Sequence, residues 1–259
     1  MGIYLVIAFL GIICGFFSGL LGIGGGIIMA PLLLYVPPIL GFEPLSMHVV
    51  AGLAIVQGLV ACISGVIVHK RFNSVSGRLA GWMGTTIFIA ALIGGAGSGY
   101  ASQHVLLLIF GMLALLAAIL ILKPRVKEKK TPPVSELSFS LWRAISTAGS
   151  VGVLGGMVGQ GGSFILIPLM TSFVRIPTRI AIGSNLAIVL LSTTAGFLGK
   201  ALTGQIEWLL SIPIVITVIP ATQIGGVLSH KVPVVKLRKI LGVLITVAAV
   251  RILISAFWG

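Results

Sequence analysis

Apolar residues run along the chain in long continuous stretches, and polar residues are confined mostly to the short segments between them. The stretches do not alternate with a period of two, so they predict helices rather than strands. Most of them approach the roughly 20 residues that a helix needs to cross a bilayer. The pattern predicts two long first segments, at about 3–36 and 145–174, and six ordinary spans, at about 44–68, 79–99, 104–122, 180–199, 208–228 and 238–258.

Composition places the chain among the polytopic helical membrane proteins. Its 259 residues are 58% hydrophobic and 8% charged, and its mean hydropathy is +1.21. Inside a bilayer only helices or closed barrels satisfy every backbone polar group, and the continuous apolar stretches favour helices. We therefore expect an all-α, multi-pass protein whose main surroundings are the lipid bilayer.

The chain contains two copies of one unit. Residues 15–32 (GFFSGLLGIGGGIIMAPL) align with residues 152–169 (GVLGGMVGQGGSFILIPL), and eight of the eighteen aligned positions are identical. Internal repetition of this kind predicts a repeated structural unit. We predict repeat A at 1–122, a basic linker at 123–139 and repeat B at 140–259.

Basic residues in the loops predict how the two copies are oriented. In repeat A they mark the second loop, with Lys70 and Arg71, whereas in repeat B they mark the first and third loops, with Arg175 and Lys231. Because cytoplasmic loops are rich in Lys and Arg, equivalent loops face opposite sides, and the repeats are inverted. This topology makes the linker 123–139 cytoplasmic and both chain ends extracytoplasmic. Each first segment must then turn back within the membrane as two helices, at least one of them short.

A glycine cluster interrupts each first segment, where we expect the helix to break. The helix that restarts there directs its positive N-terminus and free N–H groups into the protein, which favours an anion. Two such breaks in inverted repeats meet near the midplane. We attribute the outer glycines Gly11, Gly15 and Gly19 to close helix packing instead. The predicted substrate-binding residues are Gly22, Gly24, Gly25, Gly26, Gly159, Gln160, Gly161, Gly162, Ser163 and Asn185.

Charge and missing residue types exclude several classes of protein. The net charge of +13 is attributed to cytoplasmic loops rather than to nucleic-acid binding. There is no aspartate, and the four glutamates lie in or near loops or the linker, so cation transport is disfavoured. No metal-ligand spacing occurs, and no cofactor is expected. Two residues keep open roles: His48 is interfacial or proton-coupling, and Arg251 reaches the interface or attracts anions.

The pattern GxxxGxxGxGGG, followed by apolar residues and proline, occurs as GFFSGLLGIGGGIIMAP and GVLGGMVGQGGSFILIP. It resembles the sulfite exporter TauE/SafE family of membrane permeases, and the resemblance continues through GSNLAIV at 183–189. This resemblance implies a secondary transporter of small anions, typically sulfite or organosulfur anions such as sulfonates, in a bacterial or archaeal inner membrane. The family motif falls on Gly22, Gly24, Gly25, Gly26 and Pro31, and on Gly159, Gly161, Gly162, Ser163 and Pro168.

Together these features predict an anion transporter that works by alternating access around a midplane site. A passive anion channel is an open alternative, because channels also use inverted repeats and backbone anion sites. An intramembrane enzyme with Ser163 as nucleophile is disfavoured, since the four histidines are predicted at span ends or in loops. The sequence leaves open the anion, the direction of transport, the coupling ion and the oligomeric state, a homodimer included.

Overall fold

A computed structural model describes residues 2–24, 26–98, 103–122, 133–158, 163–202, 204 and 206–258. These residues form helices, and no strand occurs among them, so the all-α prediction is confirmed. The α-helices are α1 Gly2–Leu21, α2 Gly26–Ile39, α3 Met47–Arg71, α4 Gly77–Ser98, α5 Gln103–Leu122, α6 Leu141–Val158, α7 Ser163–Leu169, α8 Thr178–Leu202, α9 Trp208–Lys231 and α10 Val234–Trp258, and a π-helix, Met170–Val174, extends α7.

The first long segment is divided where its glycine cluster stands, and the second cluster, at 159–162, lies outside the described residues. In the first, α1 ends at Leu21 and α2 begins at Gly26, and in the second α6 ends at Val158 and α7 begins at Ser163. In the first segment the helix after the break is short, with 14 residues in α2, and in the second segment α7 has 7 residues. The prediction of two helices, one of them short, is therefore confirmed for the first segment, while the break predicted in the second stays a prediction.

Five helices of the described part are long and apolar enough to cross a membrane. They lie within α1, α3, α4, α8 and α9. Many of their large apolar side chains point outward: Ile93 of α4 is 63% exposed and Ile216 of α9 is 65% exposed. An aqueous surface would not favour so much exposed apolar area, whereas lipid does.

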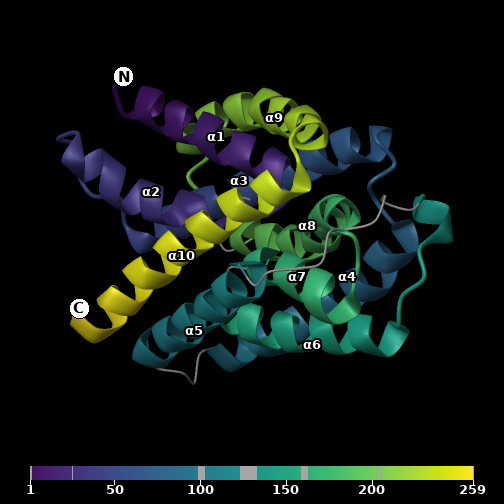
Figure 1. Cartoon of the computed structure of the whole chain (residues 1–259). Helices are drawn as coiled ribbons and strands as arrows, with labels where there is room; N and C mark the ends of the chain where they lie inside the picture. The colour runs from purple at the N-terminus through teal and green to yellow at the C-terminus, as the bar shows by residue number, and fades with distance from the viewer. Residues whose placement is uncertain are drawn as a thin grey trace.

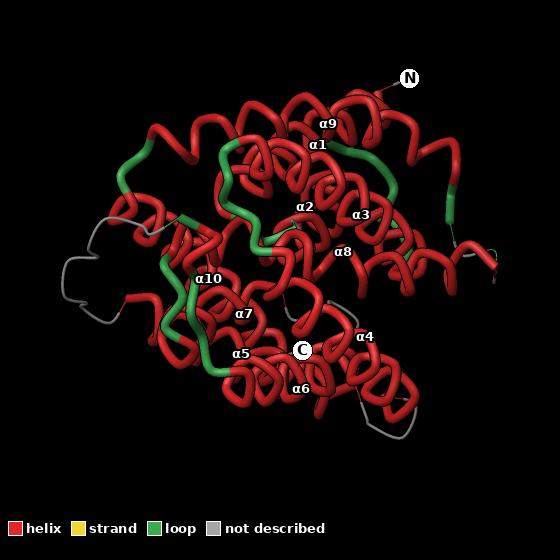
Figure 2. The backbone as a smooth tube through the Cα atoms, turned by 90° about the vertical axis from the view of Figure 1, so that its right-hand side faces the viewer, coloured by secondary structure: helices red, strands yellow, loops and turns green. Residues whose placement is uncertain are grey.

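The helices pair across the two halves of the chain. Figure 1 shows α1 beside α9 at the top of the molecule and α4 beside α6 at the bottom, and Figure 2 keeps the same order after a quarter turn. The central helices α3 and α8 also pack together, as do α5 and α10. The first helix of each half thus packs on the fourth helix of the other half. A two-fold relation between the halves would produce this pairing, while their inversion across the membrane stays a prediction.

The outer glycines allow α1 and α9 to approach closely. A Cβ on Gly15 would lie 2.9 Å from the carbonyl oxygen of Val218, and one on Gly19 would overlap the carbonyl group of Thr222. A Cβ on Gly11 would overlap the hydroxyl of Thr217. The packing role predicted for these glycines is confirmed. In the second half, Gly152 and Gly156 of α6 make equivalent close approaches to α4.

Candidate functional site

The first break is built by glycines in the left-handed backbone conformation. Gly22 has a φ of 71° and Gly24 a φ of 67°. Residues with a Cβ adopt this region only at a cost, so glycine is required here to reverse the chain after α1. The N–H of Gly22 still donates to the carbonyl of Ser18 at 2.8 Å, which closes the last turn of the helix.

The break lies against α8. A Cβ on Gly22 would overlap the carbonyl oxygen of Ile182, so only a glycine allows the two backbones to come this close. At Gly24 there is more room: an added Cβ would lie 3.4 Å from Cys62 Sγ, 3.6 Å from Val189 Cγ1 and 3.9 Å from Ser163 Oγ. The neighbourhood of Gly24 therefore contains side chains from α3, α7 and α8.

Side chains from the second half of the chain hold the carbonyl groups of the first break. Ser163 Oγ donates to the carbonyl of Ile23 at 2.7 Å. Asn185 Nδ2 donates to the carbonyl of Gly22 at 2.6 Å and to that of Ser163 at 3.2 Å. Ser163 is 4% exposed and Asn185 is fully buried. We call these three hydrogen bonds the inter-half latch, because two of them join the first break to Ser163 and Asn185 of the second half.

The residues preceding Asn185 dock the start of α8 onto the loop between α3 and α4. A Cβ on Gly183 would lie 2.5 Å from the carbonyl oxygen of Ser74. Ser184 Oγ accepts a hydrogen bond from the N–H of Ser76 at 2.9 Å. Each member of the GSN sequence at 183–185 thus has a contact of its own, and together they fix the direction in which Asn185 points.

The structure brings part of the predicted site together. Gly22, Gly24, Ser163 and Asn185 meet at the latch, and Gly26 is the first residue of α2. Five predicted residues lie outside the described part of the chain: Gly25, Gly159, Gln160, Gly161 and Gly162. The side chains of His48 and Arg251 are likewise not described.

Comparison with known proteins agrees with this architecture. The family model described as "Sulfite exporter TauE/SafE" matches residues 7–252. This chain belongs to the sulfite exporter TauE/SafE family. It is therefore a multi-pass membrane protein of a transporter family, and the family points to transport rather than to an enzymatic reaction.

Curated relatives carry compatible names. The chain is 24% identical to the probable membrane transporter protein YunE of Bacillus subtilis (strain 168), over 86% of each chain. It is 27% identical to a probable membrane transporter protein of Xylella fastidiosa (strain Temecula1 / ATCC 700964), covering 92% of this chain and 90% of the relative. A third relative is the probable membrane transporter protein MJ0441 of Methanocaldococcus jannaschii, 24% identical over 90% of this chain and 91% of its own. No solved structure matches the chain.

At the first break of this TauE/SafE family member, some polar groups have hydrogen-bond partners within the chain and others do not. The Ser163 hydroxyl and the Asn185 amide donate to carbonyl groups of the chain itself. Asn185 Oδ1 is buried without a hydrogen-bond partner. The first-turn N–H groups of α2 have no partner within their own helix, because helix geometry supplies none. The break therefore combines one unused acceptor, Asn185 Oδ1, with the N-terminus of α2.

Gln57 is a polar residue inside a long apolar helix. It lies on α3, is fully buried, and neither atom of its amide has a hydrogen-bond partner. Residue 58 beside it approaches the break, since a Cβ on Gly58 would lie 3.5 Å from the carbonyl oxygen of Gly24. Ser18 Oγ and Thr222 Oγ1 are also buried without a partner. Buried polar groups are normally paired, so this unused capacity on α1, α3 and α9 fits a polar ligand.

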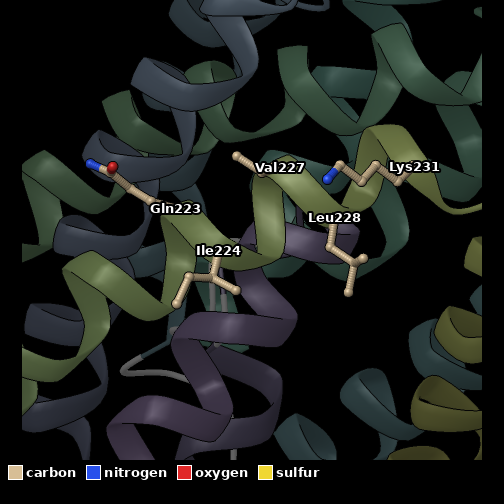
Figure 3. Close-up of a pocket in the computed structure, with 5 residues that line it drawn as sticks. All are labelled: Gln223, Ile224, Val227, Leu228 and Lys231. Carbon is tan, nitrogen blue, oxygen red and sulfur yellow. The ribbon is translucent and has the colours of Figure 1, made fainter.

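A surface pocket lies elsewhere, on α9. Figure 3 shows the side chains that line it: Gln223, Ile224, Val227, Leu228 and Lys231. Ile224 is 61% exposed, so this face of α9 belongs to the outer surface. None of the predicted substrate-binding residues lines this pocket. The pocket is bounded by one helix and mostly apolar side chains, and Gln223 and Lys231 are the polar residues in its lining.

Proposed function

We propose that this protein is a secondary transporter of a small anion, most simply sulfite or a related organosulfur anion such as a sulfonate. In this proposal the substrate binds at the two glycine breaks near the membrane midplane, and the two halves rock around it. The inter-half latch carries the proposal, because it joins a break in the first half to Ser163 and Asn185 of the second. A ligand at that junction touches both moving parts.

Anion selectivity follows from the groups available around the break. The N-terminus of α2 contributes free N–H groups and the positive end of its helix dipole. The hydroxyl of Ser163 and the amides of Asn185 and Gln57 add further donors, and no carboxylate occurs in α1, α2, α3 or α8. A small oxyanion replaces the carbonyl groups of Gly22 and Ile23 as the acceptor of the latch donors. Substrate binding thereby loosens the contact that holds the two breaks together, which links occupancy to movement.

The orientation in the membrane completes the proposal. Repeat A (1–122) and repeat B (140–259) are inverted, the linker 123–139 is cytoplasmic, and both chain ends are extracytoplasmic in a bacterial or archaeal inner membrane. The N-terminal end of α1 and the C-terminal end of α10 both lie at the left of Figure 1, and the loop between α3 and α4 lies at the right. This arrangement supports the topology, since the last turn of α3, which carries Lys70 and Arg71, leads into this loop, and the positive-inside rule places such a loop in the cytoplasm.

Flux in proteoliposomes tests the proposal. Purified protein is reconstituted, and uptake of radiolabelled sulfite is measured with and without excess unlabelled sulfite inside. A transporter shows saturable uptake that internal substrate accelerates. Uptake that follows only the gradient and the membrane potential, without acceleration, would favour the passive channel. Absence of any specific flux would remove the sulfite assignment, and the same assay with sulfonates then tests the wider anion class.

Ser163 provides the control against an enzymatic role. Ser163→Ala removes the hydroxyl that donates to Ile23 and would abolish a reaction in which this hydroxyl is the nucleophile. A transporter retains measurable counterflow in this variant, because the other donors of the site remain.

A further inference from the structure

Two histidines form a hydrogen-bonded pair at the end of the bundle that carries Lys70 and Lys231. His230 Nε2 lies 3.2 Å from His69 Nδ1, and the two ring centroids are 5.1 Å apart. His69 belongs to the last turn of α3 and His230 to the last turn of α9, 161 residues further along the chain. The pair exists only because the fold places the ends of these two helices side by side.

The pair is connected to the first glycine break through α1. His69 Nε2 lies 2.8 Å from the carbonyl oxygen of Gly19, three residues before Gly22. A carbonyl can only accept, so His69 Nε2 carries a hydrogen, and His69 Nδ1 accepts the hydrogen of His230 Nε2. His69 is 1% exposed, whereas His230 is partly exposed. An additional proton from water therefore enters the pair at His230 Nδ1.

The groups around the pair are positively charged or neutral. Arg179 of α8 donates to the carbonyl of Ser229 at 2.8 Å and to that of Val232 at 3.1 Å, one on each side of His230. The ring of Phe72 stacks on His230 with centroids 4.2 Å apart. The other charged residues at the ends of these helices are exposed: Lys70, Arg71 and Lys231. Helices α1, α3, α8 and α9 contain no acidic residue. A buried cation here is costly until an anion comes close.

We propose that His69 and His230 form a proton-binding site that couples proton movement to anion transport, an inference that rests on the proposed transport function. A proton binds His230 Nδ1, and the hydrogen on His230 Nε2 passes to His69 Nδ1. His69 then carries a hydrogen on both ring nitrogens and one positive charge, and His230 is neutral again. The positive charge then lies beside the carbonyl of Gly19, close to the break. Among the described residues of the proposed site, no other side chain is ionised. Proton and anion each bind more tightly when the other is present.

Proton-driven uptake in proteoliposomes tests this coupling. The probe is radiolabelled sulfoacetate, whose two acidic groups stay ionised between about pH 6 and about pH 8, the interval in which a histidine changes charge. For the wild type we expect counterflow at equal pH, and an initial uptake about tenfold faster when the side of entry is acidic. His69→Gln and His230→Gln should retain counterflow and lose this acceleration. His104→Gln, on α5, is the matched control and should retain both.

The outcomes separate the coupling from the transport function. Failure of wild-type counterflow would refute transport of this anion class, and the coupling with it. Wild-type counterflow without a response to the pH gradient, or an unchanged response in both glutamine variants, would overturn the coupling while leaving the transporter. A second measurement needs no variant: adding sulfoacetate to the wild-type protein in weak buffer near pH 7 should draw about one proton per molecule from solution. No proton uptake in that titration would also overturn the proposal.

Discussion

Gly22 and Gly24 have nearly the same backbone conformation but different surroundings. Alanine substitutions at the two positions therefore separate the cost of a left-handed backbone from the cost of a steric overlap. Both substitutions place a Cβ at a positive φ, which costs about 1–2 kcal/mol. At Gly22 the new Cβ also overlaps the backbone of Ile182, and a backbone neighbour cannot rotate away. That overlap adds about 1–3 kcal/mol. At Gly24 the nearest atom is Cys62 Sγ at 3.4 Å, an ordinary contact.

Thermal unfolding in detergent measures this difference. A change of about 1 kcal/mol shifts the midpoint of a chain of this size by about 2–4 °C. We expect Gly24→Ala to lower the midpoint by about 4 °C and Gly22→Ala to lower it by about 10 °C. Equal shifts for the two variants would refute the close approach of the break to α8. An unchanged midpoint for both would refute the left-handed turn itself.

Counterflow of the Gly24→Ala variant connects the turn with transport. The methyl group of Gly24→Ala enters the space between Cys62, Val189 and Ser163. If the anion binds at this break, the apparent KM should rise several-fold although most of the stability is kept. A wild-type KM in a folded Gly24→Ala protein would exclude this space from the binding site.

Three further substitutions test other parts of the structure. Gln57→Leu removes a buried amide without partners, so we expect unfolding in detergent to show a stability gain of about 1–2 kcal/mol. We also expect a loss of counterflow, and undiminished counterflow would exclude a role of Gln57 in binding. Ser163→Ala removes one latch hydrogen bond, and we expect about 1 kcal/mol lower stability and a several-fold change in KM that Ser163→Thr largely restores. Gly19→Ala should separate α1 from Thr222 of α9 and reduce the yield of folded protein. Gly81→Ala is the control and should leave the yield unchanged, because its Cβ meets nothing within 4 Å. Equal yields of the two variants would contradict the close packing.

Hydropathy and glycine spacing were sufficient to predict the helices and the first break. The span predicted at about 44–68 is α3, Met47–Arg71, and the break predicted in the first segment lies between Leu21 and Gly26. These features depend on local rules: an apolar run must be helical in lipid, and clustered glycines end a helix. The packing role of Gly15 followed from its four-residue spacing for the same reason.

The partners of the polar residues could not be predicted in this way. Asn185 was a candidate from its place in GSN, but its bond to Gly22 joins residues 163 positions apart. The His69–His230 pair spans a similar distance in sequence, and each histidine by itself reads as an ordinary residue at a span end. Gln57 became distinct only when the structure showed an amide without partners. Such contacts depend on which helices pack together, and one sequence does not contain that information.

The break also explains why a site made largely of backbone favours anions. Interrupting a helix leaves carbonyl groups at the end of α1 and N–H groups at the start of α2, and the two sets would cancel if both were left free. Here the carbonyl groups are taken. Gly19 accepts from His69, Gly22 from Asn185 and Ile23 from Ser163. The negative end of α1 is thereby neutralised by side chains from three other helices, whereas helix geometry gives the first-turn N–H groups of α2 no partner inside their own helix. Removing the side chain of Ser163 or of Asn185 should therefore weaken anion binding, whereas glutamine at position 69 keeps a donor for the carbonyl of Gly19.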